Sequence, residues 1–217
     1  AAKDRGRNRV ELYQVSDVSI IRRYEDVELA PSLRAAITEN RLRLHAQLIA
    51  PLRDPSAATH FELLLRMIDE KGEEVGPVRF LSAAVRYQLM PAVDRWVVKE
   101  AVRVLKPHAG LLANRPVAFT VNVSGQSLGD EGFEEFVVDQ ISRSGINPRV
   151  FCFELTESAA IANRARAEKM MKRLREMGCS IALDDFGTGL SSLAYLRALP
   201  IDMLKIDGSF VKDILKD

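Results

Sequence analysis

Two adjacent carboxylates, Asp184 and Asp185, end a short apolar run, and the loop that follows contains Gly187 and Gly189. Successive side chains of a strand point to opposite faces, so one carboxylate can face a cavity while the other turns at its mouth. Carboxylates this close repel each other unless a cation lies between or beside them. The pattern indicates a candidate cation site, although a plain turn, started by Asp185 and completed by glycines at positive φ, also fits it.

Three other apolar runs, separated by helical patterns, carry polar groups near their carboxyl ends: Asn122 in 117–124, Glu154 in 150–157, and Lys205 with Asp207 in 203–207. Parallel barrels place their active sites at the carboxyl ends of strands. Taken singly, Asn122 could satisfy a strand end, and Lys205 could be a buried lysine paired with Asp207 or a Schiff-base lysine. Their recurrence on four runs favours a functional site.

The elements that must position these groups are strands alternating with helices. A helix beginning at Pro31 is expected over 31–43, followed by strands at 42–52 and 61–68. The connection between these strands is too short for a crossover, so they should form an antiparallel hairpin. Further along we expect helices at 79–87, 92–106, 132–143, 161–177 and 191–198, and strands at 117–123, 150–155, from 181, and at 203–206.

Composition sets mild limits on function. The chain has 217 residues, 47% of them hydrophobic and 28% charged, so it can bury a sizeable core. A net charge of +1 gives no electrostatic case for nucleic acid or a membrane surface as a partner. Cys152 and Cys179 lie in apolar runs, as expected of buried thiols in the reducing cytoplasm.

No run approaches the ~20 apolar residues that span a bilayer, so no membrane segment is expected in this sequence. Its first residues lack the apolar core of a signal peptide. The sequence also begins without Met, and we expect it to be part of a longer protein that other segments could tether to a membrane.

Several motifs resemble, in order, those of the EAL-domain family of bacterial cyclic di-GMP phosphodiesterases. They are LHAQLI at 44–49, ELLLR at 62–66, VNVS at 121–124, ELTE at 154–157, DDFGTG at 184–189 and LKID at 204–207. The resemblance implies an α/β fold, a TIM-like (β/α)8 barrel whose first hairpin is antiparallel, here ending before the last two strands. Residues 1–13 resemble the end of a GGDEF domain, which leaves 14–30 as a linker and 31–217 as the EAL domain.

The resemblance also implies a function, the metal-dependent hydrolysis of cyclic di-GMP to linear pGpG. Mg²⁺ or Mn²⁺ would form a two-metal site, and Lys205, Asp185 and Glu62 would act in catalysis. The remaining roles carried over by the resemblance are metal ligation by Glu62, Asn122, Glu154, Asp184 and Asp185, substrate contacts from Gln47, Leu64 and Arg66, and bracing of the 186–192 loop by Glu157.

The family also implies partners: a homodimer formed through the EAL domain, and a GGDEF domain and a sensor domain in the same protein. A catalytically inactive cyclic di-GMP receptor remains the alternative function, and an unrelated lysine-based barrel enzyme is a third. Glu62 and Arg66 could instead be a surface ion pair on the hairpin. Because the family carries a further glutamate and a glutamine beyond the lysine motif, these 217 residues alone are expected to be inactive.

Overall fold

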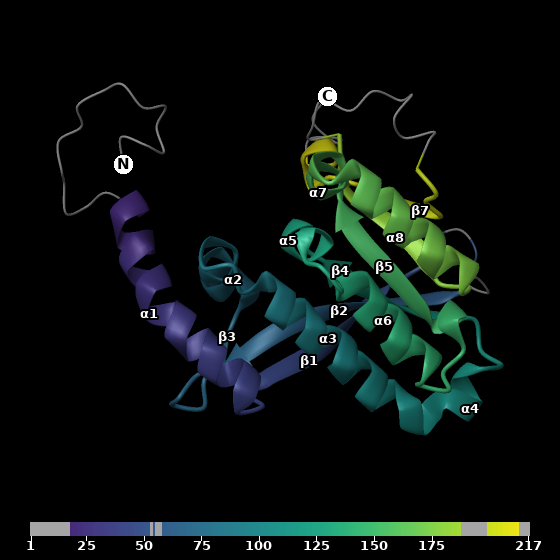
Figure 1. The fold of residues 1–217 in the computed structure, drawn as a ribbon, viewed down its shortest axis with the longest axis horizontal. Coiled ribbons are helices and arrows are strands. Elements are labelled where there is room, and N and C mark those ends of the chain that lie inside the picture. The colour runs from purple at the N-terminus through teal and green to yellow at the C-terminus, as the bar shows by residue number, and fades with distance from the viewer. Residues whose placement is uncertain (1–17, 53, 55–57, 188–198, 213–217) are drawn as a thin grey trace. The chain divides into compact units, whose positions relative to one another are not determined.

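The computed structural model describes residues 18–52, 54, 58–187 and 199–212 of the chain. After a first helix and three successive strands, helical segments separate the strands up to residue 186 (Figure 1). The chain divides into two compact units. The first unit comprises Ala1–Arg43 with Arg66–Leu89, and the second comprises Leu44–Leu65 with Met90–Asp217.

The first unit contains two packed helices, α1 (Val18–Thr38) and α2 (Pro77–Arg86). Leu33 and Ala36 of α1 and Phe80 of α2 are fully buried. A helix was expected only from Pro31 onward, but α1 begins at Val18 and contains Pro31 in its interior. An interior proline removes one backbone hydrogen bond, so the proline alone favoured a helix that begins at residue 31. The burial of apolar side chains in this unit outweighs the loss of that hydrogen bond.

Asp26 also ties α1 to α2. Its side chain is 3% exposed and lies 3.1 Å from Nε of Arg86, and it accepts a 2.7 Å hydrogen bond from the Ser82 hydroxyl. A buried carboxylate needs such partners because its charge is costly away from water. The part of α1 around Asp26, ahead of Pro31, is therefore stabilised by a contact with Ser82, 56 residues further along the chain.

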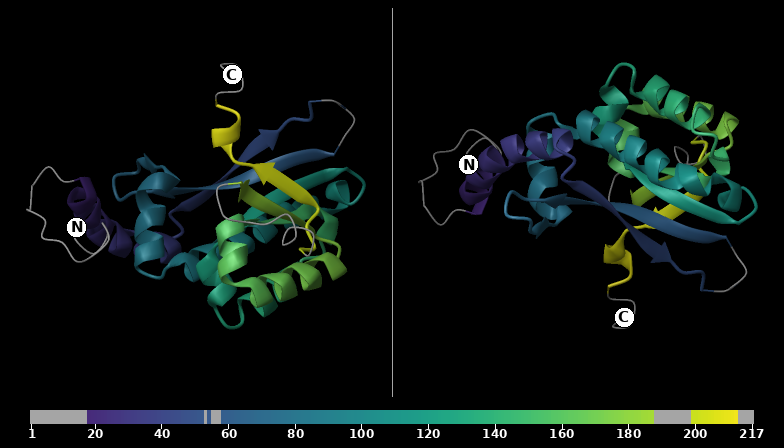
Figure 2. Two further views of the ribbon diagram at one scale, coloured as in Figure 1. Left: turned by 90° about the horizontal axis from the view of Figure 1, so that it is seen from above. Right: turned by 90° about the horizontal axis from the view of Figure 1, so that it is seen from below.

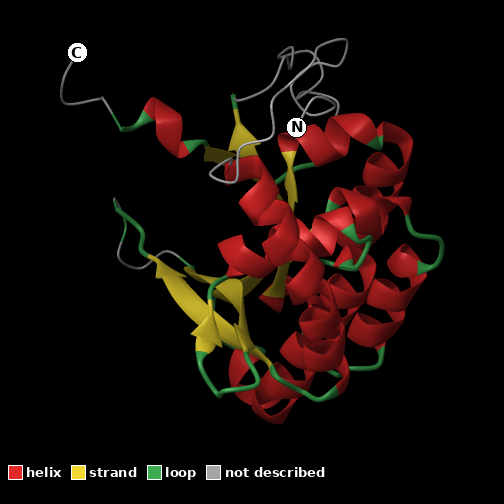
Figure 3. Cartoon of the chain, turned by 90° about the vertical axis from the view of Figure 1, so that its left-hand side faces the viewer, coloured by secondary structure: helices red, strands yellow, loops and turns green. Residues whose placement is uncertain are grey.

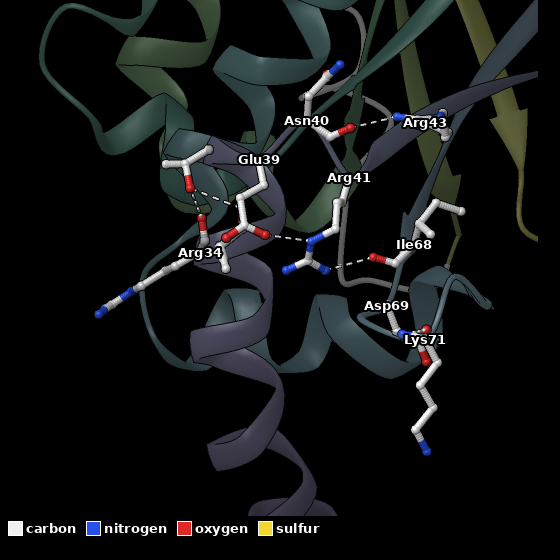
Figure 4. Close-up of polar contacts among 10 residues, drawn as sticks. Arg34, Glu39, Asn40, Arg41, Arg43, Ile68, Asp69 and Lys71 are labelled. Atoms are coloured by element: carbon white, nitrogen blue, oxygen red, sulfur yellow. Dashed lines mark hydrogen bonds and ion pairs between the residues drawn. The ribbon is translucent and has the colours of Figure 1, made fainter.

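The turn from α1 into β1 (Leu42–Ile49) is shown in Figure 4. Asn40 has a φ of 56°, and Arg41 donates to the carboxylate of Glu39 at 2.8 Å and to the carbonyl of Ile68 at 2.9 Å. The N–H of Ile68, at the end of β2 (Thr59–Ile68), donates to the carbonyl of Arg41 at 2.7 Å. The end of β2 thus meets the start of β1, which confirms the antiparallel hairpin.

The strands form one sheet in the order β1-β2-β4-β5-β6-β7, and β3 (Glu74–Val75) pairs antiparallel with the end of β2. In this order, β2, β4, β5, β6 and β7 each run parallel to the next strand. Their bounds are Val117–Val123 for β4, Phe151–Thr156 for β5, Ser180–Phe186 for β6 and Met203–Ile206 for β7. The first five residues of β5 are all buried, as expected of a strand covered on both faces.

The helices of the second unit connect these strands and gather along one face of β4, β5 and β6 (Figures 2 and 3). The longer ones are α3 (Met90–Leu105), α6 (Phe133–Ser142) and α8 (Arg164–Glu176). Short elements complete the connections: η1 (Lys106–His108), α4 (Ala109–Leu112), α5 (Gly125–Gly129), η2 (Pro148–Val150), α7 (Glu157–Ala162) and η3 (Gly208–Phe210).

The single helix expected over 161–177 is wrong, because α7 and α8 are separated at Asn163, whose φ and ψ are −124° and 37°. The Asn163 amide donates at 3.3 Å both to the carbonyl of Gly125 and to that of Ala159, the first of which lies outside the helix. Asparagine side chains compete with helical hydrogen bonding in this way. The helix expected at 191–198 lies outside the described residues.

Candidate active site

The side chain of Lys205, on β7, lies among three carboxylates from three other strands. Its Nζ is 3.2 Å from Oε2 of Glu62 on β2, 2.5 Å from Oε1 of Glu154 on β5, and 3.6 Å from Oδ1 of Asp184 on β6. The amide of Asn122, on β4, donates to Oε1 of Glu62 at 3.2 Å. All five residues belong to the second unit, and each was singled out from the sequence.

Sheet register explains why residues so distant in sequence meet. Asn122 pairs with Glu154 across β4 and β5, and Thr156 pairs with Asp184 across β5 and β6. Parallel neighbours bring their carboxyl ends to one edge of the sheet. Polar groups placed near the ends of successive strands therefore form one cluster.

Glu154 is the most deeply buried member of the cluster, with a side chain only 1% exposed. Burial raises the pKa of Glu154 to about 7, and Lys205 offsets part of that rise. Burial alone would lower the pKa of Lys205, but the hydrogen bond with Glu154 and the charges of Glu154, Glu62 and Asp184 raise it above its usual value. The lysine is accordingly a stable ammonium near neutral pH.

The two adjacent aspartates take different positions. Asp184 is partly buried beside Lys205, whereas Asp185 is exposed and has a φ of 55°, in the left-handed region. Pairing between β6 and β7 is irregular between Leu183 and Phe186, so Asp185 lies at a bulge. Desolvation, followed by the charges of Asp184 and Asp207, raises the pKa of Asp185. At the end of β6, Asp184 therefore lies beside Lys205 and Asp185 is exposed, so the two carboxylates take different positions, as the sequence indicated.

Glu157 supports the turn that follows Asp185. Its side chain is 1% exposed, and Oε2 accepts a 2.8 Å hydrogen bond from the N–H of Gly187. A Cβ built on Gly187 would lie 2.5 Å from the ring of Phe210, which covers the other side of this residue. Glu157 and Phe210 together fix the described start of the loop, while residues 188–198 lie outside the described part.

The three residues proposed to contact the substrate are less tightly grouped. Leu64 shares a face of β2 with Glu62, two residues before it, and Gln47 is exposed on β1. Arg66 belongs to the first unit, where its Nε lies 3.4 Å from Oε1 of Glu74.

Two alternative sequence interpretations are wrong. Lys205 does not pair with Asp207, whose carboxylate instead accepts a 2.8 Å hydrogen bond from the N–H of Ser209 and caps η3. Glu62 and Arg66 do not form a surface pair, since Glu62 turns to Lys205 and Arg66 to Glu74. Both pairings were suggested by closeness in sequence. In the folded sheet, Lys205 and Glu62 pair with each other instead, although they are far apart in sequence.

Asp94 is a buried carboxylate that the sequence analysis missed. It lies on α3, is 4% exposed, and accepts hydrogen bonds from the N–H of Ser124 at 2.9 Å and from the hydroxyl of Ser127 at 2.6 Å. Burial raises the pKa of Asp94 despite these bonds. A signal was present, because Asp94 interrupts the apolar face that buries Val93, Val97 and Val98.

The cluster offers the hard oxygen donors that Mg²⁺ and Mn²⁺ prefer. Oε2 of Glu154 is buried and accepts no hydrogen bond from the described residues, which leaves it available to a cation. Among the described residues, no three His, Cys, Asp or Glu side chains form a compact metal-binding group. The Lys205 ammonium is instead paired with the carboxylates of Glu62 and Glu154. The donor set therefore fits a divalent ion.

The family model of the EAL domain matches residues 30–217. The chain belongs to the EAL domain family. The sequence is 39% identical over 214 residues to the cyclic di-GMP phosphodiesterase PdeB of Shewanella oneidensis, covering 99% of this chain and 25% of that protein. It is 34% identical over 194 residues to the cyclic di-GMP phosphodiesterase PdeF of Escherichia coli, covering 89% of the chain and 25% of that protein. The chain thus spans about a quarter of the length of these curated relatives.

Solved EAL domains have the same fold. The FimX EAL domain of Pseudomonas aeruginosa bound to c-di-GMP is 30% identical with a TM-score of 0.77, over 87% of this chain and 75% of that one. A complex of the PaMucR phosphodiesterase with c-di-GMP is 31% identical with a TM-score of 0.76, over 88% and 76%. These similarities and the parallel strands joined by helices confirm the expected TIM-like α/β fold. None of the helices that the structure describes has the length and apolar character needed to cross a bilayer.

Proposed function

We propose that this EAL domain hydrolyses cyclic di-GMP to linear pGpG with Mg²⁺ or Mn²⁺. The observation that carries the proposal is the convergence of Glu62, Glu154 and Asp184 on Lys205 from four strands of one sheet. Similarity to curated cyclic di-GMP phosphodiesterases over nearly the whole chain supports the choice of substrate.

Each residue of the cluster has a distinct task in this proposal. Glu62, Asn122, Glu154, Asp184 and Asp185 would hold two divalent ions. When bound, such ions polarise a phosphodiester and supply hydroxide at neutral pH. Lys205, an ammonium in the metal-free structure, would donate hydrogen bonds to a phosphate oxygen near the attacking water. Glu157 would hold the loop start in place through the N–H of Gly187.

Substrate binding would use residues outside this cluster. Gln47 and Leu64 would contact the dinucleotide, and Arg66 would donate to a phosphate oxygen, for which a guanidinium is well suited. Arg66 would then exchange its contact with Glu74 for the substrate. The family resemblance further supports a cytoplasmic homodimer regulated by GGDEF and sensor domains in the same protein. Light scattering of the whole protein would test whether it is a dimer.

The test is an assay of the whole protein that contains these residues. Purified protein is incubated with cyclic di-GMP and Mn²⁺, and pGpG is quantified by chromatography, with Asp184→Asn as the inactive control. We expect stoichiometric conversion to pGpG that depends on Asp184. Tight binding of cyclic di-GMP without any pGpG would refute the proposal and identify a receptor instead.

A further inference from the structure

A buried hydrogen-bond network involves the residues that follow the proposed ligand Asn122 in the chain. Asp94 of α3 accepts from the N–H of Ser124 at 2.9 Å and from the hydroxyl of Ser127 at 2.6 Å, both at its Oδ2. Ser124 is the N-cap of α5, and its hydroxyl accepts from the N–H of Ser127 at 3.2 Å. The network therefore ties the segment that leaves β4 to a helix packed beside it.

Asn122 lies where β4 loses one of its two strand neighbours. The described pairing with β2 ends at Thr120, opposite Glu62, whereas pairing with β5 continues to Val123. Val121 and Val123 point into the core and Asn122 points to the other face. Beyond Thr120, the backbone that carries Asn122 is held by β5 on one side and by the anchored Ser124 after it.

Ser124 could cap α5 without help, but the cap alone would not fix the strand end. A cap of this kind satisfies a donor within α5, whereas Asp94 connects the same turn to α3. The contact is costly to build, because a carboxylate that is 4% exposed has given up its hydration. Both of its described donors belong to the turn after Asn122.

We infer that Asp94 is a positioning residue, which fixes the carboxyl end of β4 so that Asn122 meets Glu62 and the bound cation. The inference rests on the proposed function for its cation and on the hydrogen bonds for its geometry. It assigns Asp94 no contact with substrate or metal. Residues that orient ligands from behind typically change metal affinity by about 10- to 100-fold when replaced.

The variants separate geometry from charge and from loss of stability. Asp94→Ala removes the acceptor, whereas Asp94→Asn keeps an oxygen that can accept from both donors. Ser127→Ala removes one donor and keeps the other. Ser144→Ala is the matched control, because Ser144 is also a buried serine whose hydroxyl makes two hydrogen bonds, to Ile141 and from Ile146, in the turn after α6.

Two readouts are made on the whole metal-free protein. Hydrogen–deuterium exchange is followed in peptides covering 117–129, and the affinity for Mn²⁺ alone is measured by calorimetry. We expect Asp94→Ala to speed exchange in these peptides and to weaken Mn²⁺ binding about tenfold. Asp94→Asn and Ser144→Ala should stay within about twofold of the original protein in both readouts, with Ser127→Ala intermediate.

Unchanged exchange in Asp94→Ala would overturn the inference, and so would faster exchange with unchanged Mn²⁺ affinity. If Asp94→Asn weakens Mn²⁺ binding as much as Asp94→Ala does, the geometric explanation is overturned, because an oxygen acceptor at residue 94 is then not enough to keep the affinity. If the original protein itself binds no Mn²⁺, the proposed function fails instead. In that case, slow exchange in Asp94→Asn and in Ser144→Ala, together with fast exchange in Asp94→Ala, would still support the role of Asp94 in holding the end of β4.

Discussion

Replacing Gly187 with alanine tests how tightly the loop beside the aspartates is held. Gly187 has a φ of +98°, which an L side chain adopts at a cost of about 1–2 kcal/mol. The new Cβ would also lie 2.5 and 2.6 Å from two carbons of the Phe210 ring. Carbon atoms prefer separations of about 3.5–4.0 Å, so the ring must move by roughly 1 Å.

Phe210 is 58% exposed, so its ring can swing towards solvent rather than deform the core. The steric cost should therefore lie at the low end of the range for overpacking, about 1 kcal/mol. We expect Gly187→Ala to lower the free energy of unfolding by about 2–3 kcal/mol in total. Turnover should fall as well, because the same turn follows Asp184 and Asp185 and donates the Gly187 N–H hydrogen bond to Glu157.

Gly178 provides a matched control within the same unit. Its φ is +102°, but its Cβ would meet only ordinary contacts at 3.8 and 3.9 Å. Gly178→Ala should cost only the backbone strain of about 1–2 kcal/mol. Phe210→Ala, added to Gly187→Ala, should recover the steric part in a double-mutant cycle. Urea unfolding and pGpG release would be measured for each variant, and equal losses for the two glycines would refute the reasoning.

Other predictions concern the cluster itself. Glu62→Gln and Asp184→Asn should each lower pGpG release by more than about a hundredfold, beyond the usual loss at outer-shell partners, while circular dichroism stays unchanged. EDTA should abolish hydrolysis, and Mn²⁺ or Mg²⁺ but not Ca²⁺ should restore it, because Ca²⁺ is larger and less demanding in geometry. Since the pKa of Glu154 is raised to about 7, protons should compete with the metal below that pH. Turnover should fall as pH drops through 7, and more Mn²⁺ should move this acid limb to lower pH.

The sequence by itself determined the alternation of strands and helices and the polar groups at the strand ends. The strand expected over 117–123 coincides with β4 and that over 203–206 with β7. Apolar runs and helical periodicity are local properties, and they identify elements without knowledge of what packs on them. The burial of both thiols, Cys152 and Cys179, followed from the same local signal and is confirmed.

Tertiary structure alone decided which residues meet. Lys205 finds Glu62 and Glu154, which are 143 and 51 residues away, rather than its near neighbour Asp207. The part of α1 around Asp26 and the break between α7 and α8 likewise depend on distant partners, Ser82 for Asp26 and Gly125 for Asn163. Periodicity reports which face of an element is buried. The order and register of the strands determine which side chains meet. The packing of the whole unit sets that order and register.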